Sequence, residues 1–324
     1  MRLSPRAAGL LAAVVTVAVW TGFVISARAS ARYTLTPFDI AFLRFVGAGL
    51  VLLPWGFWLL RRHGLRGSLG VSPLPLGLTA GVGLTAGLLY SLGAYSAFFL
   101  APAAHGAVLM PGSLPLWTTL LAAFFLGDRI TPLRAAGLAL IVAGDLMVGG
   151  PSLLQAFSGD GGRVWIGDLL FMGAAFSWGC YTMLVRRHRL DAVHATIAVV
   201  AFMAVTYVPA YALLALTGTV ASGLAAAPWL EIVTQMVLQG LLSVVVSGIS
   251  FTLMVQYWGP VRSTMVTASV PVLSALGAVA LLGEPLYWNL LAGLALATTG
   301  IVLGVLSSRA SPAPVAAAPQ EALR

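Results

Sequence analysis

One arginine lies inside an otherwise apolar stretch and is the residue best placed to do chemistry. Arg44 stands seven positions into the stretch 37–60, roughly 10 Å along a helix that rises 1.5 Å per residue. If this stretch crosses a membrane, a charge at that depth costs about 2.5–3.5 kcal/mol, so Arg44 must face other helices and find partners. Two interpretations follow: Arg44 is pinned structurally by Asp145 or by backbone carbonyls, or it meets a substrate carboxylate.

Two further titratable residues are candidates for binding a proton or another ion. Asp145 is expected about one turn from the outer end of its apolar stretch, near the level of Arg44. It either carries a proton or is simply solvated or paired there. His105 is expected near the outer end of the next stretch upstream, a position that is more typical of the interface than of a ligand. A lone histidine makes no metal site, and we expect neither a metal nor a cofactor.

Aromatic residues and one glutamine are concentrated in mid-helix positions, where a substrate cavity is expected. Trp and Tyr near helix ends usually anchor a protein at the membrane surface, so mid-helix placement predicts side chains that face the bundle. Gln239 shares a helix face with Gln235, and it binds either a polar substrate or a neighbouring helix. The candidate cavity residues of this kind are Trp20, Tyr90, Tyr95, Trp117, Trp178, Tyr181 and Gln239.

The run Met110-Pro111-Gly112-Ser113 predicts a broken helix. Proline inside an apolar helix frees backbone groups at membrane depth, and broken helices are the best sequence pointer to a transporter's binding site. Pro111 and Ser113 are therefore candidate site residues, although a packing kink or a hinge without ligand contact explains the run equally well. The second half of the chain lacks an equivalent of Pro111, so we expect the sharper break in the first half.

The composition defines the elements that must position these residues. Of 324 residues, 60% are hydrophobic and only 8% are charged, whereas a soluble domain carries about 25% charged residues. The apolar stretches approach the roughly 20 residues that span a bilayer. We therefore predict an all-α polytopic membrane protein whose partners are the lipid bilayer and a small molecule rather than nucleic acid.

Turn residues and arginines divide the chain into ten expected transmembrane helices. Asp39 and Asp168 stand at helix starts, where a carboxylate complements the helix dipole, and we interpret both as caps. The Ser-, Ala- and Pro-rich residues 307–324 are expected to be a disordered tail. The expected helices are 8–28, 37–60, 74–99, 103–126, 132–149, 164–187, 192–216, 230–256, 260–282 and 286–306.

The sequence repeats itself. The stretch FLGDRITPLRAAGLALIVAG, residues 125–144, returns 156 positions later as LLGEPLYWNLLAGLALATTG, residues 281–300, with eight of twenty letters identical. Each copy holds five expected helices, and an odd number places the second copy upside down in the membrane, a plan that secondary transporters use. We thus expect repeats at 1–149 and 164–306, joined by an external linker at 150–163.

The distribution of arginines independently supports this topology. The chain has no lysine, and cytoplasmic connections are the ones that collect positive charge. With both termini cytoplasmic, the external side retains only Arg28, Arg32 and Arg163. The single cysteine, Cys180, rules out an intramolecular disulfide.

At this point the residues resemble the EamA-type transporters of the drug/metabolite transporter superfamily. The resemblance rests on Trp20-Thr-Gly22, on residues 37–45, on Leu114-Pro115-Leu116, on residues 125–129 and on Trp178 with Arg186-Arg187. It implies a ten-helix inverted-repeat fold in a bacterial plasma membrane, while the sequence leaves open whether the protein is a monomer or a homodimer. It also implies export of small metabolites such as amino acids by alternating access.

Rival functions fit the residues less well. Binding of a nucleotide sugar or other phosphate compound requires several cations in the cavity, but Arg44 is the only clear intramembrane cation. An organic-cation exporter wants an acid in the first helix, which has none between Gly9 and Ile25. An intramembrane enzyme needs converging catalytic groups, which the four scattered histidines and one cysteine do not offer.

Overall fold

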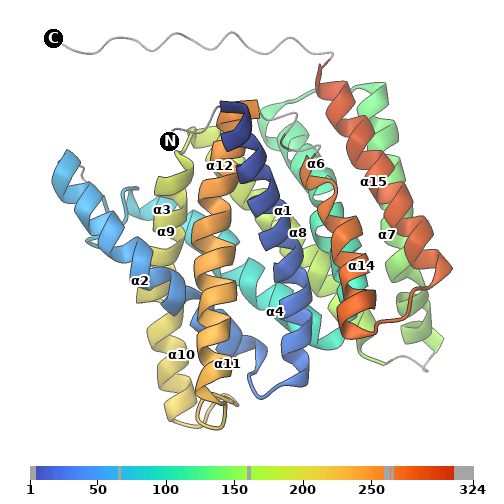
Figure 1. Cartoon of the computed structure of the whole chain (residues 1–324). Helices are drawn as coiled ribbons and strands as arrows, with labels where there is room; N and C mark the ends of the chain where they lie inside the picture. The colour runs from blue at the N-terminus through green and yellow to red at the C-terminus, as the bar shows by residue number, and fades with distance from the viewer. Residues whose placement is uncertain (1–4, 65–66, 159–161, 259–262, 264–265, 310–324) are drawn as a thin grey trace, which may run out of the picture.

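The structure, a computed structural model, describes residues 5–64, 67–158, 162–258, 263 and 266–309, and these residues form helices with no strand. Figure 1 shows a bundle in which α1 begins and α15 ends at the same end, which we call the termini end. The other end is called the opposite end. The helices are α1 (Pro5–Ala29), α2 (Pro37–His63), α3 (Leu76–Val82), η2 (Gly83–Leu89), α4 (Tyr90–Leu100), α5 (Ala103–Ala107), η3 (Val108–Gly112), α6 (Leu114–Leu126), α7 (Pro132–Ser158), α8 (Val164–His188), α9 (Ala192–Val205), α10 (Tyr207–Leu216), α11 (Trp229–Gln235), η4 (Met236–Val246), α12 (Ser247–Trp258), α14 (Val270–Leu282) and α15 (Trp288–Arg309).

Nine helical segments within the described ranges are long and apolar enough to cross a membrane. The remaining expected helix, 260–282, is represented by the shorter α14, and much of 259–265 lies outside the described residues. The helix expected to end at residue 149 instead continues to Ser158, through Pro151. Most of the expected linker is therefore helical, and the tail from residue 310 lies outside the described residues.

The start of α2 is tied down by a capping box. The Thr36 hydroxyl accepts a hydrogen bond from the Asp39 N–H, and the Asp39 carboxylate accepts one from the Thr36 N–H. This reciprocal arrangement satisfies two amides that the helix leaves free, so the interpretation of Asp39 as a cap is confirmed. Its carboxylate also accepts hydrogen bonds from the Tyr211 hydroxyl and the Ser222 hydroxyl, at 2.6 Å each, which joins α2 to α10 and its following loop.

The helix break predicted at Pro111 is present as one wide turn, η3. The Ser113 N–H reaches back five residues to the Val108 carbonyl, at 3.1 Å. The carbonyl of Leu109 accepts instead from the Ser113 hydroxyl, at 2.7 Å. Ser113 therefore uses its hydroxyl to repair the turn, and in this conformation both Pro111 and Ser113 serve the backbone geometry.

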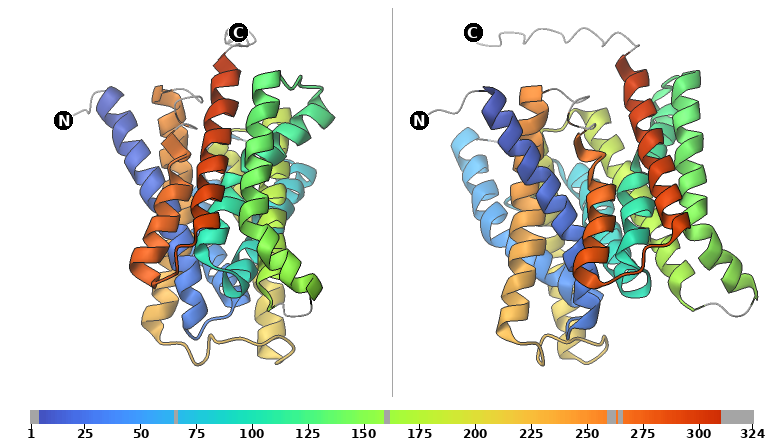
Figure 2. Two further views of the ribbon diagram at one scale, coloured as in Figure 1. Left: turned by 90° about the vertical axis from the view of Figure 1, so that its right-hand side faces the viewer. Right: turned by 45° about the vertical axis from the view of Figure 1, so that its right-hand side comes forward.

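The repeated stretches build a close seam between α7 and α15, which lie side by side in both views of Figure 2. A Cβ added to Gly137 would lie 2.7 Å from the Gly300 carbonyl oxygen, and one added to Gly144 would lie 2.6 Å from that of Gly293. The two helices run antiparallel, since rising numbers on one meet falling numbers on the other. Each glycine meets the repeat equivalent of the other, so the two copies contribute the same surface to the seam.

The close packing of α7 against α15 predicts that one methyl group added at a glycine of this seam lowers the stability of the protein. Gly137→Ala should destabilise the protein by about 1–3 kcal/mol, because the added carbon meets backbone that cannot move aside. Thermal unfolding in detergent, followed by loss of the monodisperse peak, measures the effect. Gly173→Ala in α8 is the matched control, since nothing lies within 4 Å of its added Cβ and alanine favours a helix by about 0.5–1 kcal/mol. An equal response of the two variants would contradict the seam.

Candidate functional site

Arg44 lies at a crossing of α2 with η4 and α4, and its side chain is only 6% exposed. The crossing is close because Gly240 carries no side chain: a Cβ there would lie 2.8 Å from the Arg44 carbonyl oxygen. One terminal nitrogen, Nη1, donates to the Ser243 hydroxyl at 3.0 Å and to the Tyr95 hydroxyl and the Gln239 carbonyl at 3.3 Å each. The guanidinium is therefore held by three neutral acceptors.

Aromatic rings complete the surroundings of this guanidinium. Its central carbon lies 5.6 Å from the centroid of the Phe23 ring and 6.0 Å from that of Phe45, distances at which a ring face attracts a cation. The Nε atom is buried without a hydrogen-bond partner. No ion pair among the described residues includes Arg44. The positive charge is thus buried without a counter-anion in the described part of the chain.

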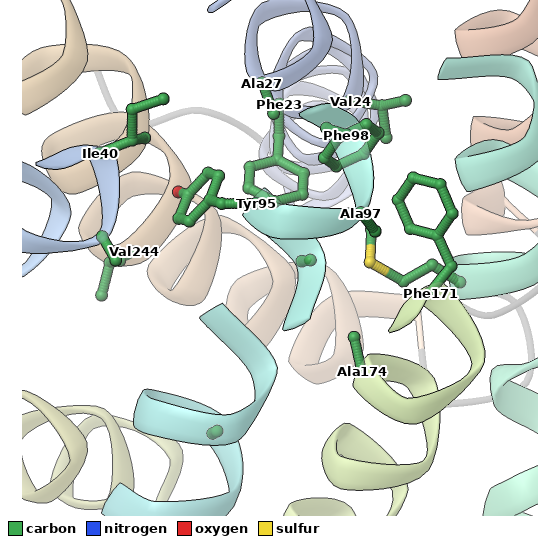
Figure 3. Close-up of a cluster of buried hydrophobic side chains, with 14 of the residues drawn as sticks. Phe23, Val24, Ala27, Ile40, Tyr95, Ala97, Phe98, Phe171, Ala174 and Val244 are labelled. Carbon is green, nitrogen blue, oxygen red and sulfur yellow. The ribbon is translucent and has the colours of Figure 1, made fainter. Parts of the chain in front are cut away.

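A chain of hydrogen bonds continues from Arg44 through three more helices. The Tyr95 hydroxyl donates to Oε1 of Gln239 at 2.9 Å, and Nε2 of Gln239 donates to the Ser26 hydroxyl at 3.0 Å. Figure 3 shows Tyr95 beside Phe23, with its hydroxyl pointing toward Ile40 and Val244 of the neighbouring helices. The structure therefore brings together three of the predicted site residues, namely Arg44, Tyr95 and Gln239.

The predicted partnership between Arg44 and Asp145 is wrong. The three hydrogen bonds of its guanidinium join Arg44 to α4 and η4, whereas Asp145 lies on α7 and both of its buried carboxylate oxygens lack a hydrogen-bond partner. The alternative, that a backbone carbonyl binds Arg44, agrees with the structure: the Gln239 carbonyl accepts a hydrogen bond from Arg44. Sequence reasoning placed the two charges at one depth, but depth does not determine which helices are neighbours.

The remaining aromatic candidates form three separate groups. Tyr90, Trp178 and Tyr181 make one cluster, in which the Trp178 ring centroid lies 4.7 Å from that of Tyr90 and 5.1 Å from that of Tyr181. The other two groups are single ring pairs: Trp20 stacks on Phe251 with centroids 5.4 Å apart, and Trp117 meets Phe176 edge to face at 5.3 Å. Tyr90 lies on α4, the helix that also supplies Tyr95 to the Arg44 site, and each of the other pairs joins helices of different repeats.

Asp168 is not the cap that its position suggested. It is buried inside α8, and its carboxylate contacts Nδ1 of His105 at 2.8 Å and accepts a hydrogen bond from the Ser152 hydroxyl. The N-cap of α8 is Arg163. His105, expected at the interface, joins α5 to α8 through this contact, with its side chain 19% exposed.

A cavity of about 130 Å³ lies beside His105 at the opposite end of the bundle, and its lining includes Arg28, Glu284 and Asn289. Glu284 is 7% exposed; it accepts from Nε of Arg28 at 2.9 Å and from the N–H groups of Ala103 and Ala104 at 3.1 and 3.4 Å. It thereby joins the ends of α1 and α14 to the start of α5. Sequence reasoning did not select Glu284, although its place in the repeat, equivalent to Asp128, was a usable signal.

Asp128 makes the corresponding contact with the other helix ends. It binds Arg186 of α8 at 2.7 Å, with side chains 29% and 54% exposed. Gly127 and Gly283 both take the left-handed conformation, with φ of 70° and 66°. The N–H groups of Asp128 and Glu284 then bond to the carbonyls of Ala122 and Ala278. In both pairs, the acid of one repeat binds an arginine at the end of the other repeat's first helix.

The acid–arginine pair and the left-handed glycine before the acid occur twice in one chain. Comparison with known proteins shows which family has this duplicated unit. The model of the EamA-like transporter family matches residues 7–150 and again 165–306. The chain belongs to the EamA-like transporter family. This EamA transporter is accordingly a multi-pass membrane protein of the drug/metabolite transporter superfamily, built from two copies of the family's unit.

Relatives of this EamA transporter carry transporter names. It is 28% identical over 312 residues to a protein of Escherichia coli (strain K12) called a probable amino-acid metabolite efflux pump, covering 94% of this chain and 96% of that protein. It is 29% identical over 190 residues to an uncharacterized transporter of Archaeoglobus fulgidus. That match spans 58% of this chain and about three fifths, 60%, of the archaeal protein.

A solved crystal structure has the same fold. It is 20% identical, superimposes with a TM-score of 0.58, and the match covers 94% of this EamA transporter and 99% of the other chain. At that identity the likeness concerns the fold alone. The family and its named members point to a transporter rather than an enzyme.

Proposed function

We propose that this EamA transporter is a secondary transporter that exports small carboxylate-bearing metabolites, such as amino acids, across a bacterial plasma membrane. The Escherichia coli relative's name supports the substrate class and the direction. A metabolite with both an ammonium and a carboxylate suits a site with one fixed cation and many neutral groups. The nucleotide-sugar alternative is not favoured, because phosphates want several cations.

The observation that carries this proposal is the buried, unneutralised charge of Arg44. Desolvating a guanidinium costs several kcal/mol unless an anion compensates it, and the acceptors around Arg44 are neutral. A substrate carboxylate supplies the missing negative charge, with the free Nε–H as one donor toward it. Tyr90, on the same helix as Tyr95, and the Trp178 ring then offer apolar surface to the rest of the substrate.

Alternating access follows from two repeats in opposite orientation. The antiparallel glycine seam and the two reciprocal acid–arginine pairs support an inverted relation of the repeats. Rocking one half against the other around Arg44 opens the site to each side in turn. In this proposal the termini end is cytoplasmic, in accord with its arginines.

Counterflow in proteoliposomes tests the proposal. Vesicles holding the purified protein are preloaded with one unlabelled amino acid each, and entry of the same amino acid in labelled form is followed. We expect transient accumulation above the external concentration for at least one amino acid. Protein-free vesicles and vesicles preloaded with an unrelated sugar are the controls and should show none.

Absence of accumulation across the whole amino-acid panel would overturn the substrate class. Nucleosides, sugars and organic cations would then be tested in the same vesicles. Accumulation of an organic cation alone would favour the drug-exporter alternative, since Arg44 repels cations and could not form such a site.

A further inference from the structure

We propose that Asp145 is a proton-binding site that couples transport to a proton gradient; this inference rests on the proposed transport function. The site would take one proton on a carboxylate oxygen in one conformation and release it to water in another. Its ligand is thus the proton itself, and the exchange would supply the energy for export.

The first support is the burial of the carboxyl group. Asp145 is 7% exposed, and neither carboxylate oxygen has a hydrogen-bond donor in contact. Burying an ionised carboxylate without a donor costs several kcal/mol, whereas the neutral acid costs far less. The described conformation therefore accommodates Asp145 with its proton on.

The second support is that no cation among the described residues contacts Asp145, although α7 itself carries Arg134 and the neighbouring α8 carries Arg186 and Arg187. The elements that pack against α7 are α15, η3, α6 and α8. In the described side chains of the first three there is no titratable group, and none of the ion pairs or hydrogen bonds of the described residues joins Asp145 to a group of α8. The titratable residues of α8 are Asp168, Cys180, Tyr181, Arg186, Arg187 and His188.

The internal repeat supplies the third support. The residue equivalent to Asp145 in the second copy is Ile301, 156 positions later, and it is 6% exposed. An apolar side chain thus fills the same place in the same kind of seam. Packing of this seam has no need of a carboxyl group, so the acid has another role.

The position of Asp145 explains how its proton would follow the transport cycle. It follows Gly144 directly, at the close approach of α7 and α15, which belong to different repeats. The Asn289 amide adds a hydrogen bond to the Met147 carbonyl, at 3.2 Å, across the same seam. Any rocking of one repeat against the other moves the two sides of this seam and changes the access of water to Asp145.

A pH gradient across the vesicle membrane tests the coupling. With one proton exchanged per substrate, a gradient of about one pH unit should drive about tenfold accumulation of the amino acid identified by counterflow, since a factor of ten corresponds to about 1.4 kcal/mol. Asp145→Asn should lose this accumulation and keep counterflow at equal pH, because exchange needs no net proton movement. Asp145→Ile, which copies the second repeat, is the matched packing control and should behave in the same way.

The outcomes separate the two proposals. Wild-type counterflow without a response to the pH gradient would overturn the proton site and leave the transport function standing, and so would an Asp145→Asn protein that still accumulates substrate. Absence of counterflow with every substrate would count against the transport function instead.

A spectroscopic measurement tests proton binding without any substrate. The infrared difference spectrum between the wild type and Asp145→Asn, in lipid nanodiscs at pH 7, should contain the C=O stretching band of a protonated carboxylic acid. Asp168→Asn is the control, because Asp168 has the partners that an ionised carboxylate needs. A difference spectrum that contains only the carboxylate bands would overturn the proposal.

Discussion

Replacing Arg44 by alanine is expected to abolish transport of carboxylate-bearing substrates. Loss of a buried charge partner costs about 2–5 kcal/mol, or at least about thirtyfold in substrate affinity. Arg44→Lys should recover only part of the activity, because an ammonium retains the charge but lacks the planar fork of a guanidinium. Counterflow of the labelled amino acid in proteoliposomes measures both variants.

Tyr95→Phe distinguishes a binding role of Arg44 from a purely structural one. This change removes one acceptor of Arg44 and the only donor that the structure gives to Oε1 of Gln239. It should cost about 1–3 kcal/mol of stability and leave counterflow measurable. If Arg44→Ala and Tyr95→Phe lower the melting temperature equally and both retain counterflow, the role of Arg44 is purely structural.

Replacing Glu284 by glutamine is expected to open the opposite end of the bundle. Breaking a fully buried ion pair costs about 3–5 kcal/mol, and the cost here is smaller because the Arg28 side chain is 26% exposed and keeps its hydrogen bond to the Phe98 carbonyl. Glu284 also holds two N–H groups at the start of α5. A cysteine introduced by Ala104→Cys, in a Cys180→Ser background, should therefore react at least about tenfold faster with a membrane-impermeant maleimide in the Glu284→Gln variant.

Asp128→Asn is the matched control for this experiment. Asp128 has the equivalent place in the first repeat, but its partner Arg186 is 54% exposed, and exposed pairs are worth about 0–1 kcal/mol. The control should leave labelling at Ala104→Cys nearly unchanged. Equal labelling of the Glu284→Gln protein and its parent, with both still folded, would contradict a closing role for the Arg28–Glu284 pair.

Much of the architecture was predictable because the apolar stretches and the internal repeat of a membrane protein are visible in its sequence. Twenty-residue apolar stretches predict the spans, and the repeated stretch predicts two equivalent units, which the two matches of one family model confirm. The cap at Asp39 and the break at Pro111 were also predictable, since both depend on residues within a few positions of each other. These signals depend on residues that are neighbours in the sequence, so they can be recognised without the tertiary structure.

Sequence by itself therefore determined the class of the protein, its duplication, and the residues capable of chemistry within it. The tertiary structure decided the pairing: Arg44 with Tyr95 and Gln239, Asp168 with His105, and Glu284 with Arg28. Pairing depends on which helices become neighbours and how each is rotated about its axis. Those choices are made by close packing at glycines such as Gly240 and Gly144, and no periodicity along a single helix encodes its partner.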